Sequence, residues 1–401
     1  MSPGALAGLR VLDLSQVLAG PFCTQLLADH GAEVIKIEPP EGDPARRFAP
    51  FRPDDGERAF GGYFQSINRG KKSVVLDLKT AADREAFLRL VDRADVLVEN
   101  FRAGVMERLG LGYETLARRN PRLVYAAIRG FGDPRTGQSP YTDWPAFDVV
   151  AQALGGIMGI TGPAADLPLK IGPGVGDTVP ALMLAFGILA AVRHAERTGQ
   201  GQFLDIAMVD GVLALCERLV HQYSYTGEVA RPEGNGHPLL CPFGLFRAAD
   251  GWVAIGCPTD KFWVELAAAI GRPELGADPG WATNAARLGR RGEVTALIEA
   301  FTGRHSKAEL KALFGGRVPF GPVQDAAEIF ADPHFAARGM LVQVEQPGSD
   351  TPVTIAGVPV HLSATPGAVR GRAPRLGEHS TEILAGLSGT GSGQDSREFP
   401  V

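Results

Sequence analysis

The sequence lacks an excess of charge of either sign. Its 401 residues include 40 basic and 45 acidic side chains, which gives a formal net charge of −5. Such a balance provides no overall attraction to nucleic acid or to an anionic membrane surface, so any anionic ligand would have to meet a local cluster of cations. We therefore expect neither nucleic acid nor a membrane among the partners of this chain.

Cysteine and long apolar runs are also scarce. The chain is long enough to bury a large core without disulfides, and none of its cysteines forms a C-x-x-C pair, so we expect a reducing compartment and no metal site. The N-terminus has no apolar segment typical of a signal peptide. The longest apolar run, Val179–Val192, has fourteen residues, fewer than the ~20 that span a bilayer. These features predict a cytoplasmic protein in which this run is a buried core helix. The four cysteines are Cys23, Cys216, Cys241 and Cys257.

Several catalytic motifs are absent. The chain has no G-x-S-x-G, no P-loop and no H-E-x-x-H, and the turn after the first expected strand, residues 15–21, has no G-x-G-x-x-G. These absences argue against hydrolases of the corresponding classes, zinc peptidases and dinucleotide-dependent dehydrogenases. Glycine, in contrast, is abundant: 51 glycines and 30 prolines without a Gly-X-Y period indicate many tight turns rather than collagen.

Short β-rich runs alternate with helical stretches over the first 130 residues. This alternation predicts an α/β fold, a parallel sheet with helices on both faces. The expected strands are residues 9–14, 33–37, 73–78, 96–98 and 123–128, followed by a strand at 203–206 and a helix at 209–225.

Composition also divides the chain into domains. We expect a discontinuous large domain, formed by residues 1–205 and 335–385, in which late strands at 340–346 and 353–355 return to the N-terminal sheet. Residues 206–238 are expected to form a linker helix and loop, and residues 239–334 a smaller α+β domain. The last segment, residues 386–401, is predicted to be a flexible tail.

Several motifs, none specific alone, follow one another in a set order. Together they resemble the class III CoA-transferases, the family of formyl-CoA and carnitine CoA-transferases, from about residue 6 to about residue 385. The motifs are Val17-Leu-Ala-Gly-Pro-Phe-Cys-Thr24, Asn68-Arg-Gly-Lys-Lys-Ser73, Val98-Glu-Asn-Phe-Arg102, Arg129-Gly-Phe-Gly132, Ala146-Phe-Asp-Val-Val-Ala-Gln152, Gly176-Asp177, Arg197-Thr-Gly-Gln-Gly201 and Ala373-Pro-Arg-Leu-Gly-Glu-His379.

The resemblance implies a fold and a reaction. The large domain would be Rossmann-like and completed by the C-terminal segment, and two chains would form an interlaced, ring-like homodimer. The substrates would be an acyl-CoA and a small carboxylic acid, with coenzyme A as a substrate and no prosthetic group or metal.

Asp177 is the residue on which the implied chemistry depends. By sequence alone, an aspartate just before a helix that starts at Thr178 is a favourable N-cap. The resemblance implies that Asp177 is also the nucleophile that attacks the acyl-CoA thioester. We expect the helix N-terminus to lower the pKa of Asp177, and the glycines at 172, 174 and 176 to leave room for the thioester.

Binding of CoA requires local cations and an aromatic surface. Lys71 and Lys72, and Arg102 and Arg108 around Phe101, are such clusters, although solvated surface charge is an equally simple interpretation. The resemblance implies that Asn100 and Phe101 lie by the adenine, Arg108 by a phosphate and Ala19 along the cofactor path, with Lys72 as a further contact.

A second glycine cluster contains Gly234, Gly236 and His237. It is either an interdomain turn or a shortened form of the four-glycine loop that closes over the intermediate in formyl-CoA transferases. Other departures concern the substrate. Gln16, Leu18, Pro39 and Pro145 replace the residues of oxalate-using members, which disfavours formate and oxalate.

Two alternatives to a transferase remain. An α-methylacyl-CoA racemase shares the implied fold but has a His-Asp pair where this chain has Phe147-Asp148, and Phe147 cannot transfer a proton. A CoA-binding protein without turnover is the other alternative. The donor and acceptor acids stay open at this point.

Overall fold

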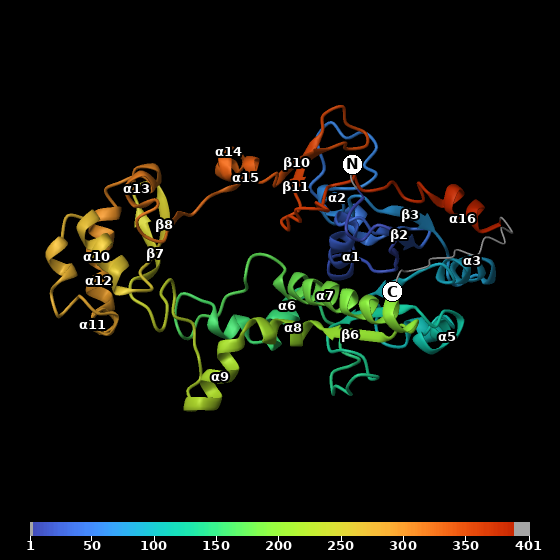
Figure 1. Ribbon diagram of the computed structural model, residues 1–401, viewed down its shortest axis with the longest axis horizontal. Helices are drawn as coiled ribbons and strands as arrows, with labels where there is room; N and C mark the ends of the chain where they lie inside the picture. The colour runs from blue at the N-terminus through green and yellow to red at the C-terminus, as the bar shows by residue number, and fades with distance from the viewer. Residues whose placement is uncertain (1–2, 389–401) are drawn as a thin grey trace. The chain divides into compact units, whose positions relative to one another are not determined.

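The computed structural model describes residues 3–388, which form two compact units (Figure 1). The first unit contains the described residues up to Ile157, then Ile171–Val220, and the described residues from His334 on. The second contains Met158–Lys170 and His221–Pro333. The predicted small domain, 239–334, lies in the second unit except for its last residue. The predicted tail was residues 386–401. Its first three residues, 386–388, form the last turn of helix α16 (Ser380–Ser388). The rest of the predicted tail lies outside the described residues.

A six-stranded sheet forms the centre of the first unit. All neighbouring strands are parallel, and their order is β3-β2-β1-β4-β5-β6, so the predicted α/β fold with a parallel sheet is confirmed. Val11 of β1 pairs with both Val34 and Val96, which fixes the register at the point where the order reverses. The strands are β1 (Arg10–Asp13), β2 (Glu33–Glu38), β3 (Lys72–Val75), β4 (Val96–Glu99), β5 (Val124–Arg129) and β6 (Phe203–Ala207).

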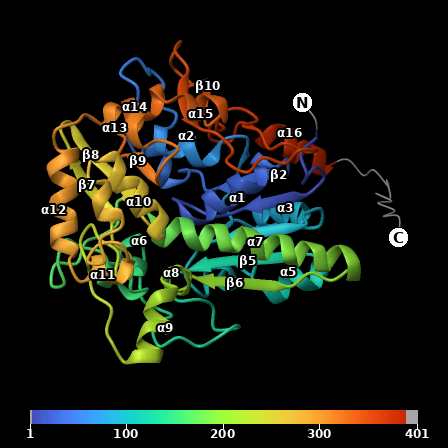
Figure 2. The same cartoon turned by 60° about the vertical axis from the view of Figure 1, so that its left-hand side comes forward.

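Helices cover both faces of this sheet because its side chains alternate between them. Leu12 and Leu14 belong to a core cluster with residues of α3 (Ala81–Val91), α5 (Tyr113–Arg119) and α16. On the other face, α1 (Ala19–Asp29) and α7 (Val175–Thr198) contact each other and the strands, and Figure 2 shows them side by side. The remaining elements of the first unit include η1 (Pro44–Arg47), α2 (Gly62–Asn68), α4 (Val105–Arg108), α6 (Asp148–Leu154) and α8 (Met208–Leu215).

Helix α7 contains the long apolar run and is only half buried. By length and composition alone it could cross a membrane. One face packs on α1, α8 and β5, burying residues such as Leu184 and Ile188. The opposite face exposes Leu182, Leu189 and, to 77%, Phe186. The expectation of a fully buried core helix is therefore wrong for this second face.

The late strands form, but they do not extend the parallel sheet. β10 (Leu341–Val344) and β11 (Val353–Ala356) make an antiparallel pair of their own within the first unit. The outer edge of β3 is occupied instead by the segment before α16: His379 Nδ1 accepts from Ser73 N at 3.2 Å, and Ser380 Oγ accepts from Val75 N at 3.0 Å. These contacts occupy backbone groups of Ser73 and Val75 with which a further strand would have to pair.

The second unit has its own sheet and core. β7 (Phe243–Ala248), β8 (Gly251–Gly256) and β9 (Phe320–Pro322) form an antiparallel sheet, and Trp263 and Phe314 are fully buried beside it. The helix expected at 209–225 is two helices, α8 and α9 (Glu217–Thr226), because the chain leaves helical geometry at Cys216. The helices that lie wholly in this unit are α10 (Asp260–Ala269), η3 (Pro273–Gly276), α11 (Asn284–Leu288), α12 (Arg291–Thr302), α13 (Lys307–Phe314) and α14 (Ala326–Ala331). η2 (Ile157–Ile160), α9 and α15 (Pro333–Ala337) each have residues in both units.

Candidate active site

A cavity of about 670 Å³ lies in the first unit at the carboxyl edge of the six-stranded sheet. Its walls include the loops that follow β1 and β4, the strands between which the sheet order reverses. Ligands of open parallel sheets bind outside the strand ends at such a point. The residues that line it include Gln16, Val17, Leu18, Ala19, Phe48, Asn100, Phe101, Arg102, Arg129, Trp144, Phe147, Asp177 and Met208.

Asp177 reaches this cavity from the first turn of α7. The helix begins at Val175 with Gly174 as its N-cap residue, so Asp177 is the third helical residue. The prediction that Asp177 caps a helix starting at Thr178 is therefore wrong. No hydrogen bond to its carboxylate forms within residues 3–388, so the two oxygens are not occupied by a structural role there.

Asp148, the first residue of α6, supplies the cap that Asp177 does not. Its Oδ1 accepts from Gly176 N at 2.9 Å, and Gln152 Nε2 donates to both of its oxygens at 2.9 and 3.0 Å. A Cβ at position 176 would lie 2.5 Å from the carbonyl oxygen of Asp148, so glycine is needed there for α7 to approach α6. Two carboxylates, Asp148 and Asp177, therefore lie close to one another.

This pairing changes the acidity of Asp177. Burial first, and then the negative charge of Asp148, raise the pKa of Asp177 to about 7. The expectation of a lowered pKa is wrong, because desolvation and a like charge outweigh the helix N-terminus. At neutral pH the carboxylate of Asp177 is therefore divided between its ionised and protonated forms.

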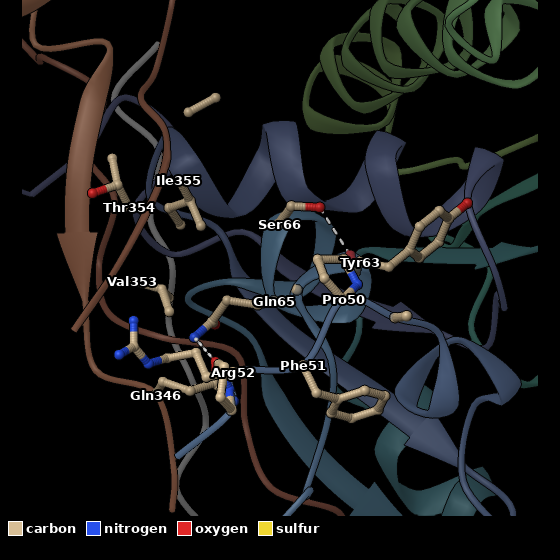
Figure 3. Close-up of a pocket in the computed structure, with 14 residues that line it drawn as sticks. Pro50, Phe51, Arg52, Tyr63, Gln65, Ser66, Gln346, Val353, Thr354 and Ile355 are labelled. Carbon is tan, nitrogen blue, oxygen red and sulfur yellow. Dashed lines mark hydrogen bonds between the residues drawn. The ribbon is translucent and has the colours of Figure 1, made fainter. Parts of the chain in front are cut away.

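Tyr63 of α2 shares this electrostatic environment. Burial, followed by the charges of Asp177, Asp43 and Asp148, raises the pKa of its phenol to about 12, so the hydroxyl stays a neutral donor. Its ring meets Phe48, which lines the Asp177 cavity, edge-on at 5.4 Å. Tyr63 also borders a separate cavity of about 620 Å³, and there its hydroxyl points away from Gln65 and Gln346 (Figure 3).

Three of the five residues expected to contact CoA line the Asp177 cavity: Ala19, Asn100 and Phe101. Both polar groups of the Asn100 side chain are engaged with the backbone of Gln16, at 2.8 Å each. Arg102 also lines the cavity and is exposed.

Lys72 and Arg108 lie elsewhere. Lys72 pairs with Glu33 at 2.9 Å and Glu382 at 3.5 Å. Arg108 borders a separate, open cavity of about 560 Å³ together with Lys79 and Arg84. Lys71, the neighbour of Lys72, is fully buried and pairs with Asp13 at 2.9 Å, so it is not a surface cation.

The glycine loop belongs to the second unit and is held within it. Gly234 has a φ of +64° and donates to the carbonyl of Gly162 at 3.0 Å. His237 packs edge-on against Phe243, and its carbonyl accepts from Arg291 Nη1 at 2.6 Å. Asp177 belongs to the first unit.

Sequence reasoning missed Asp148, Gln152 and Tyr63 as members of the site. The i, i+4 spacing of Asp148 and Gln152 was a usable signal, because it places both side chains on one helical face. Tyr63 gave no such signal, since its proximity to Asp177 arises from the packing of distant segments.

Comparisons with known proteins show the family to which the chain is similar. The family model described as CoA-transferase family III matches residues 6–380. A succinyl-CoA:mesaconate CoA-transferase of Haloarcula hispanica is 53% identical over 391 residues, covering 97% of this chain and 98% of the relative. A succinyl-CoA–D-citramalate CoA-transferase of Chloroflexus aurantiacus is 40% identical, covering 96% of this chain and 95% of the relative.

Solved structures give the same result for the fold. A CAIB/BAIF family protein from Brucella suis superimposes with a TM-score of 0.86 at 36% identity, and the match covers 96% of this chain and 100% of that one.

Proposed function

This chain belongs to CoA-transferase family III, and from that premise we propose that it moves CoA from an acyl-CoA to a free carboxylic acid through covalent intermediates on Asp177. The observation that carries the proposal is a carboxylate, not engaged by hydrogen bonds within the described residues, at the carboxyl edge of a parallel sheet. A nucleophile must be accessible and partly ionised at working pH, and a pKa of about 7 meets that need.

The reaction would proceed in four balanced steps. An oxygen of Asp177 attacks the thioester carbonyl and expels CoA thiolate, leaving an acyl-aspartyl anhydride. The thiolate attacks the aspartyl carbonyl, which releases the donor acid and leaves an aspartyl-CoA thioester. The acceptor carboxylate attacks that thioester and expels CoA thiolate, which leaves a second acyl-aspartyl anhydride. The thiolate then attacks the acyl carbonyl of this anhydride and expels the carboxylate of Asp177. The products are the new acyl-CoA and the Asp177 carboxylate.

We propose a succinyl donor and a small dicarboxylic acceptor such as mesaconate. The support is the 53% identity over almost the full length to a relative named for that pair. The CoA moiety would pass Ala19, Asn100 and Phe101. Arg108 ends α4, which follows β4, and would be an outer contact for a phosphate. Lys72 begins β3 at the amino edge of the sheet and pairs with Glu33, so we do not propose it as a CoA contact.

We also propose an interlaced homodimer. Its support is a row of exposed apolar side chains on one side of α7: Leu182, Phe186 and Leu189. Exposed apolar residues that adjoin one another in this way are typical of protein contacts. The enzyme would work in the cytoplasm, where acyl-CoA substrates are formed.

Trapping of the intermediate tests the mechanism. Hydroxylamine added with succinyl-CoA should convert acylated Asp177 to a hydroxamate, located by peptide mass spectrometry. The matched control is Asp210→Asn, since Asp210 is likewise the third residue of a helix, α8, but is exposed and outside the cavity. The control should keep both trap and turnover, and Asp177→Asn should lose both. A hydroxamate on another carboxylate would contradict the mechanism.

A panel of carboxylic acids identifies the acceptor. Each acid is incubated with succinyl-CoA, and the new acyl-CoA is read by mass spectrometry. Mesaconate and similar dicarboxylates should give product at the highest kcat/KM, and formate and oxalate little. A preference for monocarboxylic acids would refute the proposed acceptor class while leaving the family reaction intact.

A further inference from the structure

The loop between β1 and α1 forms one wall of the Asp177 cavity in a strained conformation. Residues Gln16 to Ala19 all line the cavity. Val17 has a φ of +66°, in the left-handed region that β-branched residues avoid because Cβ crowds the backbone. A residue stays in such a region only where its surroundings hold it there.

Side chains satisfy the backbone groups in the middle of this loop, from Ser15 to Val17. Asn100 Oδ1 accepts from Gln16 N at 2.8 Å, and Asn100 Nδ2 donates to Gln16 O at 2.8 Å. The next amide, Val17 N, donates to Asp43 Oδ1 at 3.2 Å. The preceding carbonyl, Ser15 O, accepts from Lys36 Nζ at 2.7 Å. Three side chains from three separate segments thus fix consecutive peptide groups.

The anchors beneath the loop are themselves rigid. Lys36 and Asp43 form a fully buried ion pair at 2.9 Å. Asp13 accepts from Ser15 N at 3.0 Å and pairs with the buried Lys71. Separating such a buried ion pair is costly, because each charge would lose its partner where no water can replace it.

We propose that Asn100 is a positioning residue whose amide clamps Gln16 and so holds the strained Val17 and the cavity wall in the form that binds acyl-CoA. This inference rests on the proposed function. It gives the Asn100 side chain a task besides the position near the adenine that the family resemblance implies, because each end of its amide already makes one hydrogen bond to Gln16.

Loss of the clamp should lower the share of molecules with a competent wall. A strained residue of this kind costs about 1–3 kcal/mol, a factor of about 5 to 150 in an equilibrium. If Asn100→Ala lowers the fraction of molecules with the competent wall about tenfold, the apparent affinity for acyl-CoA falls by the same factor. We expect the KM for succinyl-CoA to rise about tenfold and kcat to change by less than about threefold.

Val17→Gly separates positioning from ligand contact. Glycine adopts a positive φ at no steric cost, so it removes the strain that the clamp opposes. The double variant Val17→Gly/Asn100→Ala should therefore recover at least about fivefold of the lost kcat/KM. Asn120→Ala is the matched control, because the Asn120 side chain likewise makes two hydrogen bonds to the backbone. Its Nδ2 donates to the carbonyls of Val91 and Ala94 at 2.9 and 2.8 Å. Asn120 lies before β5, at the opposite edge of the sheet.

Hydrogen–deuterium exchange of the peptide spanning residues 14–22 gives a readout that needs no turnover. It should speed up in Asn100→Ala and not in Asn120→Ala. Unchanged exchange together with unchanged KM would overturn the clamp. A KM defect that Val17→Gly leaves untouched would also overturn it and favour a direct ligand contact. If the wild type transfers no CoA, the proposed function fails, and the exchange result still decides the clamp.

Discussion

Replacing Asp177 by Asn should make the protein more stable at alkaline pH while abolishing CoA transfer. In the folded protein the pKa of Asp177 is about 7, against 3.8 in an unperturbed chain. The folded state therefore holds the proton more tightly than the unfolded state, and the ionised carboxylate destabilises the fold. Asparagine has the same shape without the charge.

The magnitude follows from the pKa. A rise of about 3 corresponds to about 4 kcal/mol, and because cavity water reaches part of the carboxylate we expect about 2–4 kcal/mol. The sign is fixed by linkage: below about pH 4 both states are protonated and the two proteins should be equally stable, and the advantage of Asp177→Asn should grow up to about pH 7 and then level off.

Urea unfolding followed by tryptophan fluorescence measures this difference at pH 5, 6, 7 and 8, at one protein concentration because an oligomer is expected. Asp210→Asn, at the matching position of α8, should show no such trend. The same Asp177→Asn sample should bind CoA and give no transfer. A stability difference that does not change with pH, or a wild type that is the more stable protein at pH 8, would refute the reasoning.

Three further outcomes are expected. Asp148→Asn removes the like charge and so lowers the pKa of Asp177; the acid limb of the kcat/KM profile should move to lower pH, and an unmoved limb would exclude coupling between the two carboxylates. In D₂O with a 2-methylacyl-CoA, the enzyme should leave the α-position unlabelled, because Phe147 cannot transfer a proton; enzyme-dependent labelling would favour a racemase. Tagged and untagged dimers mixed under native conditions should not exchange subunits within hours, since interlaced chains cannot separate without unfolding, and rapid heterodimer formation would contradict interlacing.

The fold class followed from the sequence because its signal is local. Each strand of the parallel sheet is a short apolar run bounded by turns, as at Val96–Glu99. The helices between the strands show apolar residues at helical spacing. The late strands were also found, but their partners were not. The residues of β10 and β11 carry no signal for which strand they pair with. The edge of β3 is covered by His379 and Ser380, which lie outside these three strands.

Only the identity of the site residues that lie in motifs could be predicted from the sequence. Asp177 was placed in the cavity by its motif, yet its position in the helix and its acidity were wrong. Both errors arise from tertiary packing. Burial, and then the charge of Asp148, raise the pKa of Asp177, and Asp148 also caps Gly176. These contacts exist only after α6 and α7 pack. Lys71 and Lys72 show the same limit, since adjacent residues have opposite surroundings, one buried with Asp13 and one on the surface with Glu33.

The position of the C-terminal segment has a consequence for synthesis on the ribosome. Two buried side chains near the start of the chain form hydrogen bonds with this late segment. Arg46 Nη1 donates to Pro374 O at 2.9 Å, and Gln65 Oε1 accepts from Ala373 N at 2.7 Å. A nascent chain that has just passed Ala207 contains all six strands of the sheet, but these partners are still untranslated. At ~5–20 residues per second the interval lasts roughly 10–30 s. A chain that ends at a premature stop codon shortly before residue 373 would therefore contain all six strands but lack the hydrogen-bond partners of Arg46 and Gln65.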